Sequence, residues 1–179
     1  GPFDSSYSLS ILNRCFADAL SKKINQCSIH ITEGLGDYAP NINYLKKYPK
    51  SFDLYKSSLK SSSSSDLLSR NLYPPRVNDM KAKLNILHSY GWEESEFPDE
   101  WVSDFNSCLQ GITVMSSQVK KILIDNGVNL PIRVAGLGLD QFSSITPSSN
   151  YQIKAKNFKI LHISSCFPRK GIDLLLNAY

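Results

Sequence analysis

The segment 158–179 constrains the fold most strongly, because it predicts a strand, a basic turn and a helix in direct succession. The apolar run at 160–163 predicts a strand, and Pro168-Arg169-Lys170-Gly171 predicts the turn. Apolar residues then recur at helical spacing, at Ile172, Leu175, Leu176 and Tyr179. A basic turn between a strand and a helix is suited to holding a phosphate group. The pattern stops partway through the expected helix, so we expect an incomplete unit here.

Strand and helix patterns alternate along residues 1–142. Strands are expected at 27–32, 66–71, 83–88, 111–115 and 131–135, and helices at 8–20, 100–108 and 118–125. Serines precede two of the helices, so we expect Ser116-Ser117 to cap the last helix, and Ser5, Ser6 or Ser8 to cap the first. Alternating strands and helices favour an α/β fold, a Rossmann-like parallel sheet flanked by helices.

The chain divides into three predicted regions. Residues 1–142 form a Rossmann-like domain, 143–157 lack a core pattern and are expected to be an interdomain linker, and 158–179 would open a second Rossmann-like domain. Within the first domain, 35–65 has the least ordered composition and ends in a run of serines, which predicts a flexible loop.

Targeting signals and cysteine spacing predict the compartment. No apolar stretch approaches the roughly 20 residues that span a bilayer, and no signal-peptide pattern opens the chain. The four cysteines lie far apart without a C-x-x-C pair, and Cys15, Cys27 and Cys108 lie in apolar-periodic segments. We therefore expect buried free thiols rather than a metal site or disulfides, and a cytoplasmic location.

Lysines and aromatic residues are interleaved within 44–60. The lysines are Lys46, Lys47, Lys50, Lys56 and Lys60, and the aromatic residues are Tyr44, Tyr48, Phe52 and Tyr55. Such a segment can rest on an anionic membrane surface, where each nearby cation contributes about 1 kcal/mol, so peripheral membrane contact through 46–60 is a further hypothesis. The same lysines could contact nucleic-acid phosphates, although we expect no nucleic-acid partner, and the simpler alternative is a solvated loop.

Several motifs together resemble one family. The order PIRVAGLGLDQF at 131–142 and FKILHISSCFPRKGIDLLLNAY at 158–179 resembles the domain junction of a family 4 type retaining glycosyltransferase with the two-Rossmann (GT-B) fold. The segment YGWEESEFPDEW at 90–101, followed by Phe105-Asn106, is similar to a W-E-x-x-x-x-P-x-x-W…F-N pattern in a bacterial branch of these enzymes. The opening GPFDSSYSLSILNR at 1–14 resembles their first loop and helix.

The resemblance implies a reaction and its substrates. It makes 1–142 the acceptor-side domain and 158–179 the beginning of the donor-binding domain, with sugar passing from a nucleotide-diphosphate sugar to a glycan or lipid-linked acceptor with retention. Fixed cations facing the leaving diphosphate lower the barrier, so neither a metal nor a cofactor is expected. It also implies that this chain alone is inactive, and that the complete protein works in the cytoplasm or at the membrane in polysaccharide biosynthesis.

The resemblance assigns the donor site to the basic turn. Lys170 matches the family's diphosphate-binding lysine, and Gly171 allows close approach of the backbone. The family's second cation, an arginine five residues before that lysine, is Ser165 here. Arg169 is the candidate substitute, with a different geometry. The alternative is that Arg169 and Lys170 are exposed turn residues only.

The acceptor side has three groups of candidates. The opening loop, with Gly1, Asp4, Ser5 and Ser6, would lie under the donor phosphates and the acceptor, where backbone N–H groups can face an anion. Otherwise, Asp4 and the serines only cap the helix.

His88 ends a predicted strand at the carboxyl edge of the sheet, where the family often carries a histidine beside the reacting sugar, and it is our catalytic candidate. A structural histidine is the alternative. Glu93 and Glu94 beside Trp92 suit binding of sugar hydroxyls, the ring stacking on the sugar face; alternatively, they belong to a capped loop in which Trp92 and Trp101 fill the core.

Two other classes of protein compete with an enzyme. Ser165 favours a non-catalytic glycan- or protein-binding module of the same fold. An unrelated doubly wound domain ranks last, because the sequence has neither an acidic triad at strand ends nor a G-x-x-x-x-G-K-[ST] loop. Gly136-Leu-Gly138 lacks the third glycine and the following helix of a dinucleotide fingerprint, so it predicts only the exit from the last strand.

Overall fold

The computed structural model describes residues 1–32, 39–60, 65–139, 145–146, 148 and 157–179. These residues divide into two compact units, 1–138 and 139–179. Most of the predicted linker 143–157 lies outside the described residues.

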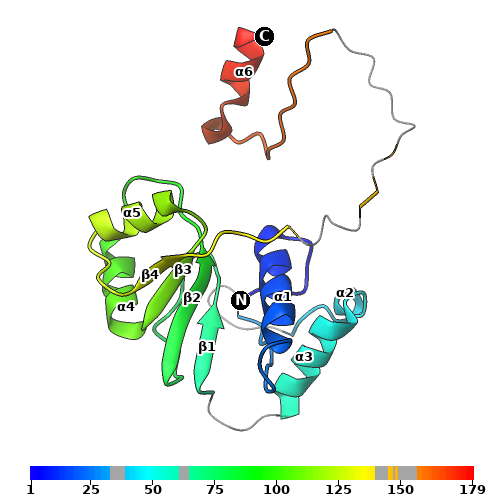
Figure 1. Ribbon diagram of the computed structural model, residues 1–179, viewed down its shortest axis with the longest axis vertical. Helices are drawn as coiled ribbons and strands as arrows, with labels where there is room; N and C mark the ends of the chain where they lie inside the picture. The colour runs from blue at the N-terminus through cyan, green and yellow to red at the C-terminus, as the bar shows by residue number, and fades with distance from the viewer. Residues whose placement is uncertain (33–38, 61–64, 140–144, 147, 149–156) are drawn as a thin grey trace. The chain divides into compact units, whose positions relative to one another are not determined.

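Unit 1 contains a four-stranded parallel sheet with the strand order β1–β2–β3–β4 (Figure 1). The strands are β1 (Leu67–Arg70), β2 (Leu84–Tyr90), β3 (Gly111–Val114) and β4 (Ile132–Val134). In register, Leu67 pairs with Leu84, and Ile112 pairs with Leu87 and with Ile132. The prediction of an α/β fold with a parallel sheet is thereby confirmed.

Helices flank this sheet. Figure 1 shows α4 (Asp99–Cys108) and α5 (Ser117–Asp125) on the side of β3 and β4, and α1 (Ser8–Ser21) and α3 (Pro49–Lys60) on the side of β1. The short α2 (Ile42–Leu45) precedes α3. No helix in the described part of the chain is long and apolar enough to cross a membrane.

Two apolar clusters stabilise unit 1. The larger one joins the sheet to α4 and α5 and includes the buried residues Leu87, Tyr90, Phe105, Val114 and Leu123. The smaller one joins the opening loop to α1, to α2 and to the segment between these two helices, through Phe3, Ala17, Ile29 and Leu45. The carboxyl ends of β1 and β2 adjoin the second cluster, and the candidate site lies there.

The predicted strand at 27–32 is absent. Ile29 is buried in the smaller cluster, and its amide donates to the carbonyl of Leu54 on α3 over 3.3 Å. A strand requires a neighbouring backbone that pairs along its length, and a single bond to a helix supplies no ladder. The alternation in CSIHIT therefore yields an irregular segment in which Ile29 and Thr32 are buried.

The predicted loop over 35–65 was wrong for most of its described residues. The segment forms α2 and α3, with Leu45 buried and Phe52, Leu54 and Tyr55 half-buried against the smaller cluster. These apolar contacts stabilise the helix that the lysines and serines obscured in the sequence. The serines at 61–64 lie outside the described residues.

The beginning of α1 also differs from prediction. Tyr7 is the N-cap residue and makes no side-chain capping bond, while Ser8 is already helical. Ser5 Oγ instead accepts a hydrogen bond from the amide of Tyr7 over 3.3 Å. The buried face of α1 carries Ser10, Asn13, Arg14 and Ala17 rather than the predicted apolar stripe, so Cys15 is exposed and its predicted burial was wrong.

Unit 2 contains a 3-10 turn, η2 (Pro168–Lys170), followed by α6 (Ile172–Ala178), as the pattern predicted. The predicted strand at 158–163 is absent, and Leu161 and Ile163 are 83% and 84% exposed. The described residues give this segment no neighbouring strand, and an isolated strand does not persist in water.

Candidate functional site

A cluster of polar side chains lies at the carboxyl ends of β1 and β2. It includes Asn13, Asn71 and His88, which are 4%, 2% and 4% exposed. In parallel α/β sheets ligands bind beyond this edge, so a polar cluster here marks the place where a site is expected. The cluster also fixes the opening loop 1–6, which the resemblance predicted to lie under the donor phosphates and the acceptor.

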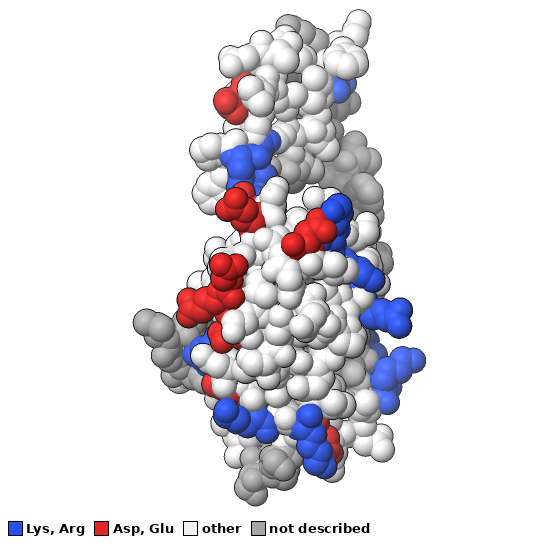
Figure 2. Space-filling model, turned by 90° about the vertical axis from the view of Figure 1, so that its left-hand side faces the viewer, with Lys and Arg blue, Asp and Glu red and all other residues white. Residues whose placement is uncertain are grey.

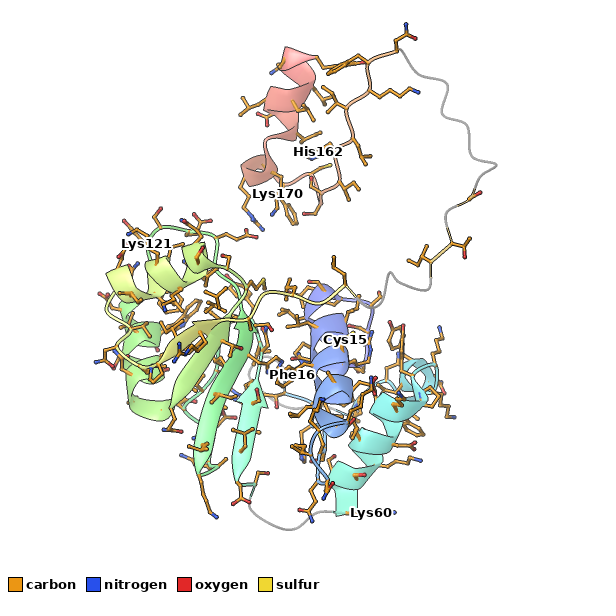
Figure 3. The ribbon with its side chains drawn as sticks, viewed as in Figure 1. Cys15, Phe16, Lys60, Lys121, His162 and Lys170 are labelled. Atoms are coloured by element: carbon orange, nitrogen blue, oxygen red, sulfur yellow. The ribbon has the colours of Figure 1, made fainter. Side chains whose placement is uncertain are left out.

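His88 occupies the centre of the cluster. Its Nε2 lies 2.8 Å from Asn13 Oδ1, and its Nδ1 lies 2.8 Å from Ser69 Oγ. Its ring stacks on Phe16, with centroids 3.9 Å apart and an interplanar angle of 5°. Figure 3 shows Phe16 on the side of α1 that faces the sheet. Burial, and then the positive amino group at residue 1, lower the pKa of His88 to about 3, so the ring is neutral at physiological pH.

Asn13 connects this histidine to the opening loop. Its Nδ2 donates to the carbonyls of Pro2 and Asn71 over 2.8 and 3.0 Å. Gly1 lies against the same atoms: a Cβ on Gly1 would come within 2.1 Å of the Asn71 carbonyl oxygen and 2.5 Å of Asn13 Nδ2. Only glycine fits this close approach, so the loop backbone is held directly against the end of β1.

The other side of the loop is bound to α1 and α2. Arg14 donates from Nη1 to the carbonyls of Phe3 and Ser5 over 2.6 and 2.7 Å. Asp4 is buried, and its Oδ2 accepts from the amide of Asn41 over 2.7 Å. Ser5 Oγ lies 2.9 Å from Ser10 Oγ. The loop is thus preorganised by side chains of α1 and by a backbone amide at the beginning of α2.

The backbone is strained near the end of β2, one residue before Tyr90, which still pairs with Val114 of β3. Ser89 has φ of 48°, in the left-handed region that ordinary residues avoid, and the register between β2 and β3 shifts at this point. Thr113 Oγ1 accepts from the Ser89 amide over 2.9 Å, and Asn71 Nδ2 donates to the Ser89 carbonyl over 3.0 Å. Strain of this kind costs about 1–3 kcal/mol and concentrates at functional sites.

A groove of about 810 Å³ adjoins the cluster. Gly1, Asn13, Phe16 and His88 line one part of it, and β1 with the residues before it, the irregular segment 24–30 and parts of α1 and α3 line most of the rest. The sequence-predicted residues Gly1 and His88 are therefore brought together on one groove. Asp4 is buried beside α2, Ser5 is half-buried, and Ser6 is exposed.

The acidic candidates lie elsewhere. Glu93 and Glu94 are exposed, and Glu94 lines a second hollow of about 770 Å³ that shares no lining residue with the groove. Trp92 donates from Nε1 to the Glu96 carbonyl over 2.8 Å and packs edge-on against Trp101, with centroids 5.5 Å apart. Figure 2 views the molecule from the side of α4 and α5 and shows acidic side chains gathered over part of that face.

The donor candidates lie in unit 2. Arg169 and Lys170 are exposed in η2, and Gly171 follows with φ of 66°, a conformation that favours glycine. The amide of Gly171 donates to the Pro168 carbonyl over 3.1 Å, which closes the turn before α6. Ser165, at the family's arginine position, is exposed.

Sequence reasoning missed Asn13, Arg14, Ser69 and Asn71. A signal was present in α1, where Ser10, Asn13, Arg14 and Ala17 recur at helical spacing, but the apolar residues beside them obscured it. No group of three or more metal-ligating side chains occurs in the described ranges.

The fold and the cluster define the class of this protein as an α/β domain with a parallel sheet and a polar site at the carboxyl edge of its strands. The chain matches no known family model, and comparisons with curated proteins and with solved structures find no match.

Proposed function

We propose that the chain is the acceptor-side domain, with the beginning of the donor domain, of a retaining glycosyltransferase with the GT-B fold. The enzyme transfers a sugar from a nucleotide-diphosphate sugar to a glycan or lipid-linked acceptor without a metal. The observation that carries the proposal is the opening loop, which Asn13 and Arg14 bind at the carboxyl ends of β1 and β2, where one end of a groove along β1 reaches Gly1 and His88. The motifs at 90–106 and 158–179 supply the reaction class.

The reaction places its charge on the diphosphate. The bond between the anomeric carbon and the diphosphate oxygen breaks, and the acceptor oxygen forms a bond on the same face of the sugar. The acceptor proton passes to the leaving phosphate, so no strong protein base is required. In this proposal Lys170 faces the growing negative charge of the diphosphate.

His88 serves the proposed site as a positioning residue. Both of its ring nitrogens have partners, so its role is to hold Asn13, which in turn holds the loop at Pro2. Direct contact of His88 with the reacting sugar stays a prediction.

A non-catalytic binding module is the second candidate. It is favoured by Ser165 in place of the family's arginine and by the neutral, fully engaged ring of His88. Such a module would bind a glycan or a protein through the same groove and would release no nucleotide.

The test uses the complete protein and a panel of nucleotide-diphosphate sugars. Thermal unfolding is measured with each sugar for the wild type, for Lys170→Ala and for the control Lys159→Ala, another exposed lysine of unit 2. A bound donor raises the apparent stability by RT ln(1 + [L]/Kd), so we expect one donor to raise the Tm in the wild type and the control only.

Release of nucleoside diphosphate is then followed with that donor. Release supports the transferase. If the donor binds but no nucleoside diphosphate is released with each of the acceptors tested, the result supports the binding module. If no donor shifts the Tm, the donor site at Lys170 is excluded.

A further inference from the structure

A basic surface lies at the junction of α2 and α3. We define it by the exposed Lys46, Lys47, Lys50 and Tyr48 and the half-exposed Tyr44. The sequence predicted these residues in a flexible loop, but they are held by two helices anchored through the buried Leu45. Their side chains are therefore presented together on a fixed support.

Charge is distributed unequally over unit 1. Residues 46–60 contain five lysines and one aspartate, a net charge of +4, whereas 84–119 contain six acidic residues and no lysine or arginine, a net charge of −6. Figure 1 places α2 and α3 on the side of β1 and α4 on the other side. An anionic surface would attract the first side and repel the second, so the distribution favours one orientation.

Acidic neighbours compensate only part of this charge. Asp53 pairs with Lys56 over 2.7 Å, and Asp18 lies 3.6 Å from Lys22 and 3.8 Å from Lys50. Lys22, Lys50 and Lys56 keep 61%, 71% and 51% of their side chains exposed. Exposed pairs of this kind are weak, so the lysines remain able to contact another anion.

The tyrosines of the basic surface are held with their polar ends together. Their hydroxyl oxygens lie 3.3 Å apart, and the ring of Tyr48, 39% exposed, packs under the guanidinium of Arg14 at 4.3 Å. Lys47 Nζ lies 5.5 Å from the centre of the Tyr44 ring. Tyrosine beside lysine is the combination enriched where proteins meet the headgroup layer of a membrane.

The basic surface is joined directly to the opening loop. Asn41, the N-cap of α2, donates to Asp4, and Arg14 bridges the Tyr48 ring to the carbonyls of Phe3 and Ser5. Any partner that contacts the basic surface is therefore brought close to the opening loop.

We propose that the basic surface docks the protein on an anionic lipid bilayer, with α2 and α3 against the headgroups. The attraction stands on charge and aromatic placement alone and does not depend on the proposed transferase. If that function also holds, docking brings a lipid-linked acceptor to the opening loop.

The experiment is sedimentation of the complete protein with phosphatidylcholine vesicles, with and without phosphatidylglycerol. The variant Lys46→Gln/Lys47→Gln/Lys50→Gln removes three cations of the basic surface. The control Lys81→Gln/Lys83→Gln/Lys120→Gln removes three cations elsewhere in unit 1. Circular dichroism checks that both variants fold like the wild type.

The wild type should bind the anionic vesicles much more tightly than the neutral ones, and added salt should weaken this binding. Each lysine near the surface contributes about 1 kcal/mol, so the first variant should bind about 100-fold more weakly. The control should change binding far less, although its net charge changes equally.

Two results would overturn the proposal. One is equal binding to vesicles with and without phosphatidylglycerol. If the lysines bound a DNA or RNA duplex but not the anionic vesicles, the proposal would be overturned in the same way. The other is an equal loss of binding in the two variants, since net charge and not the basic surface would then be responsible. Donor binding measured in parallel keeps failure of docking distinct from failure of the transferase proposal.

Discussion

At the scale of single residues, the contacts of His88 determine its protonation. Both hydrogens of Asn13 Nδ2 are used on carbonyl oxygens, so Asn13 Oδ1 must accept from His88 Nε2. Nδ1 is then unprotonated and accepts from the Ser69 hydroxyl. A second proton on this ring would reverse the bond to Ser69, whose hydroxyl would then accept from Nδ1, and would place a charge in a buried position.

This arrangement predicts a pH dependence of stability. Burial lowers the pKa of His88 from 6.5 to about 3, so the unfolded chain binds a proton that the folded chain does not. The stability that this provides is complete above pH 6.5 and is lost as the pH falls toward 3, by about 1.4 kcal/mol per pH unit. Between pH 7 and pH 5 the wild type should therefore lose about 2 kcal/mol through His88 alone.

Urea unfolding of His88→Gln at both pH values checks this. The variant is expected to be less stable at pH 7, because Asn13 and Ser69 lose their partner, but to lose about 2 kcal/mol less on acidification. His30→Gln is the comparison: partial burial also lowers the pKa of His30, but this side chain lies at the surface, so the change in acid sensitivity should be smaller than for His88→Gln. Equal acid sensitivity in the wild type and His88→Gln would show that folding does not lower the pKa of His88.

At the scale of elements, α5 offers a direct test of a predicted cap. The Ser116 side chain accepts from the amide of Val119 over 3.2 Å, as the sequence predicted for this pair of serines. Because α5 covers the larger core through Leu123, loss of the cap should affect the whole unit. We expect Ser116→Ala to lower the free energy of unfolding by about 1 kcal/mol.

The neighbouring serine provides the control. Ser117 is exposed as the first residue of α5, and Ser117→Ala should change the stability by less than about 0.5 kcal/mol. Unfolding of both variants in urea gives the comparison. Equal losses would assign the effect to helix propensity rather than to the capping bond.

The elements also show what the sequence could predict. The strands from β1 to β4 were predicted from short apolar runs, and each of these runs pairs with a neighbouring strand in the sheet. The segments 27–32 and 158–163 have the same local pattern, but a strand depends on a neighbouring backbone, which local pattern does not report.

The candidate site was predicted less completely than the fold. His88 and Gly1 were predicted because each has a signal in its own segment. His88 ends an apolar run, and Gly1 belongs to the opening loop that precedes the first helix. Asn13 and Asn71 were missed because their role arises from long-range hydrogen bonds between α1, the end of β1 and β2. Such partners become visible only when the chain is folded.

At the scale of the whole molecule, the two units differ in how their residues are buried. Every residue of the two apolar clusters lies between Phe3 and Ile132, and the described residues of unit 2 are exposed or half-buried. Four of its large apolar side chains are at least 70% exposed: Phe158, Leu161, Ile163 and Leu174. Among the described residues, the apolar side chains whose burial stabilises the fold therefore lie in unit 1.

Hydrogen exchange of the 179-residue chain tests this difference. Amides of β2 and β3 are bonded within the sheet and should exchange only on global unfolding, whereas amides in 158–163 should exchange at rates near those of an unfolded peptide. Strong protection of 158–163 in this chain would contradict the assignment. In a longer chain that includes the proposed donor domain, the same peptide should become protected, because the apolar run would then be a paired strand of a buried parallel sheet. Rapid exchange of 158–163 in that longer chain would argue against the two-Rossmann fold on which the proposed function depends.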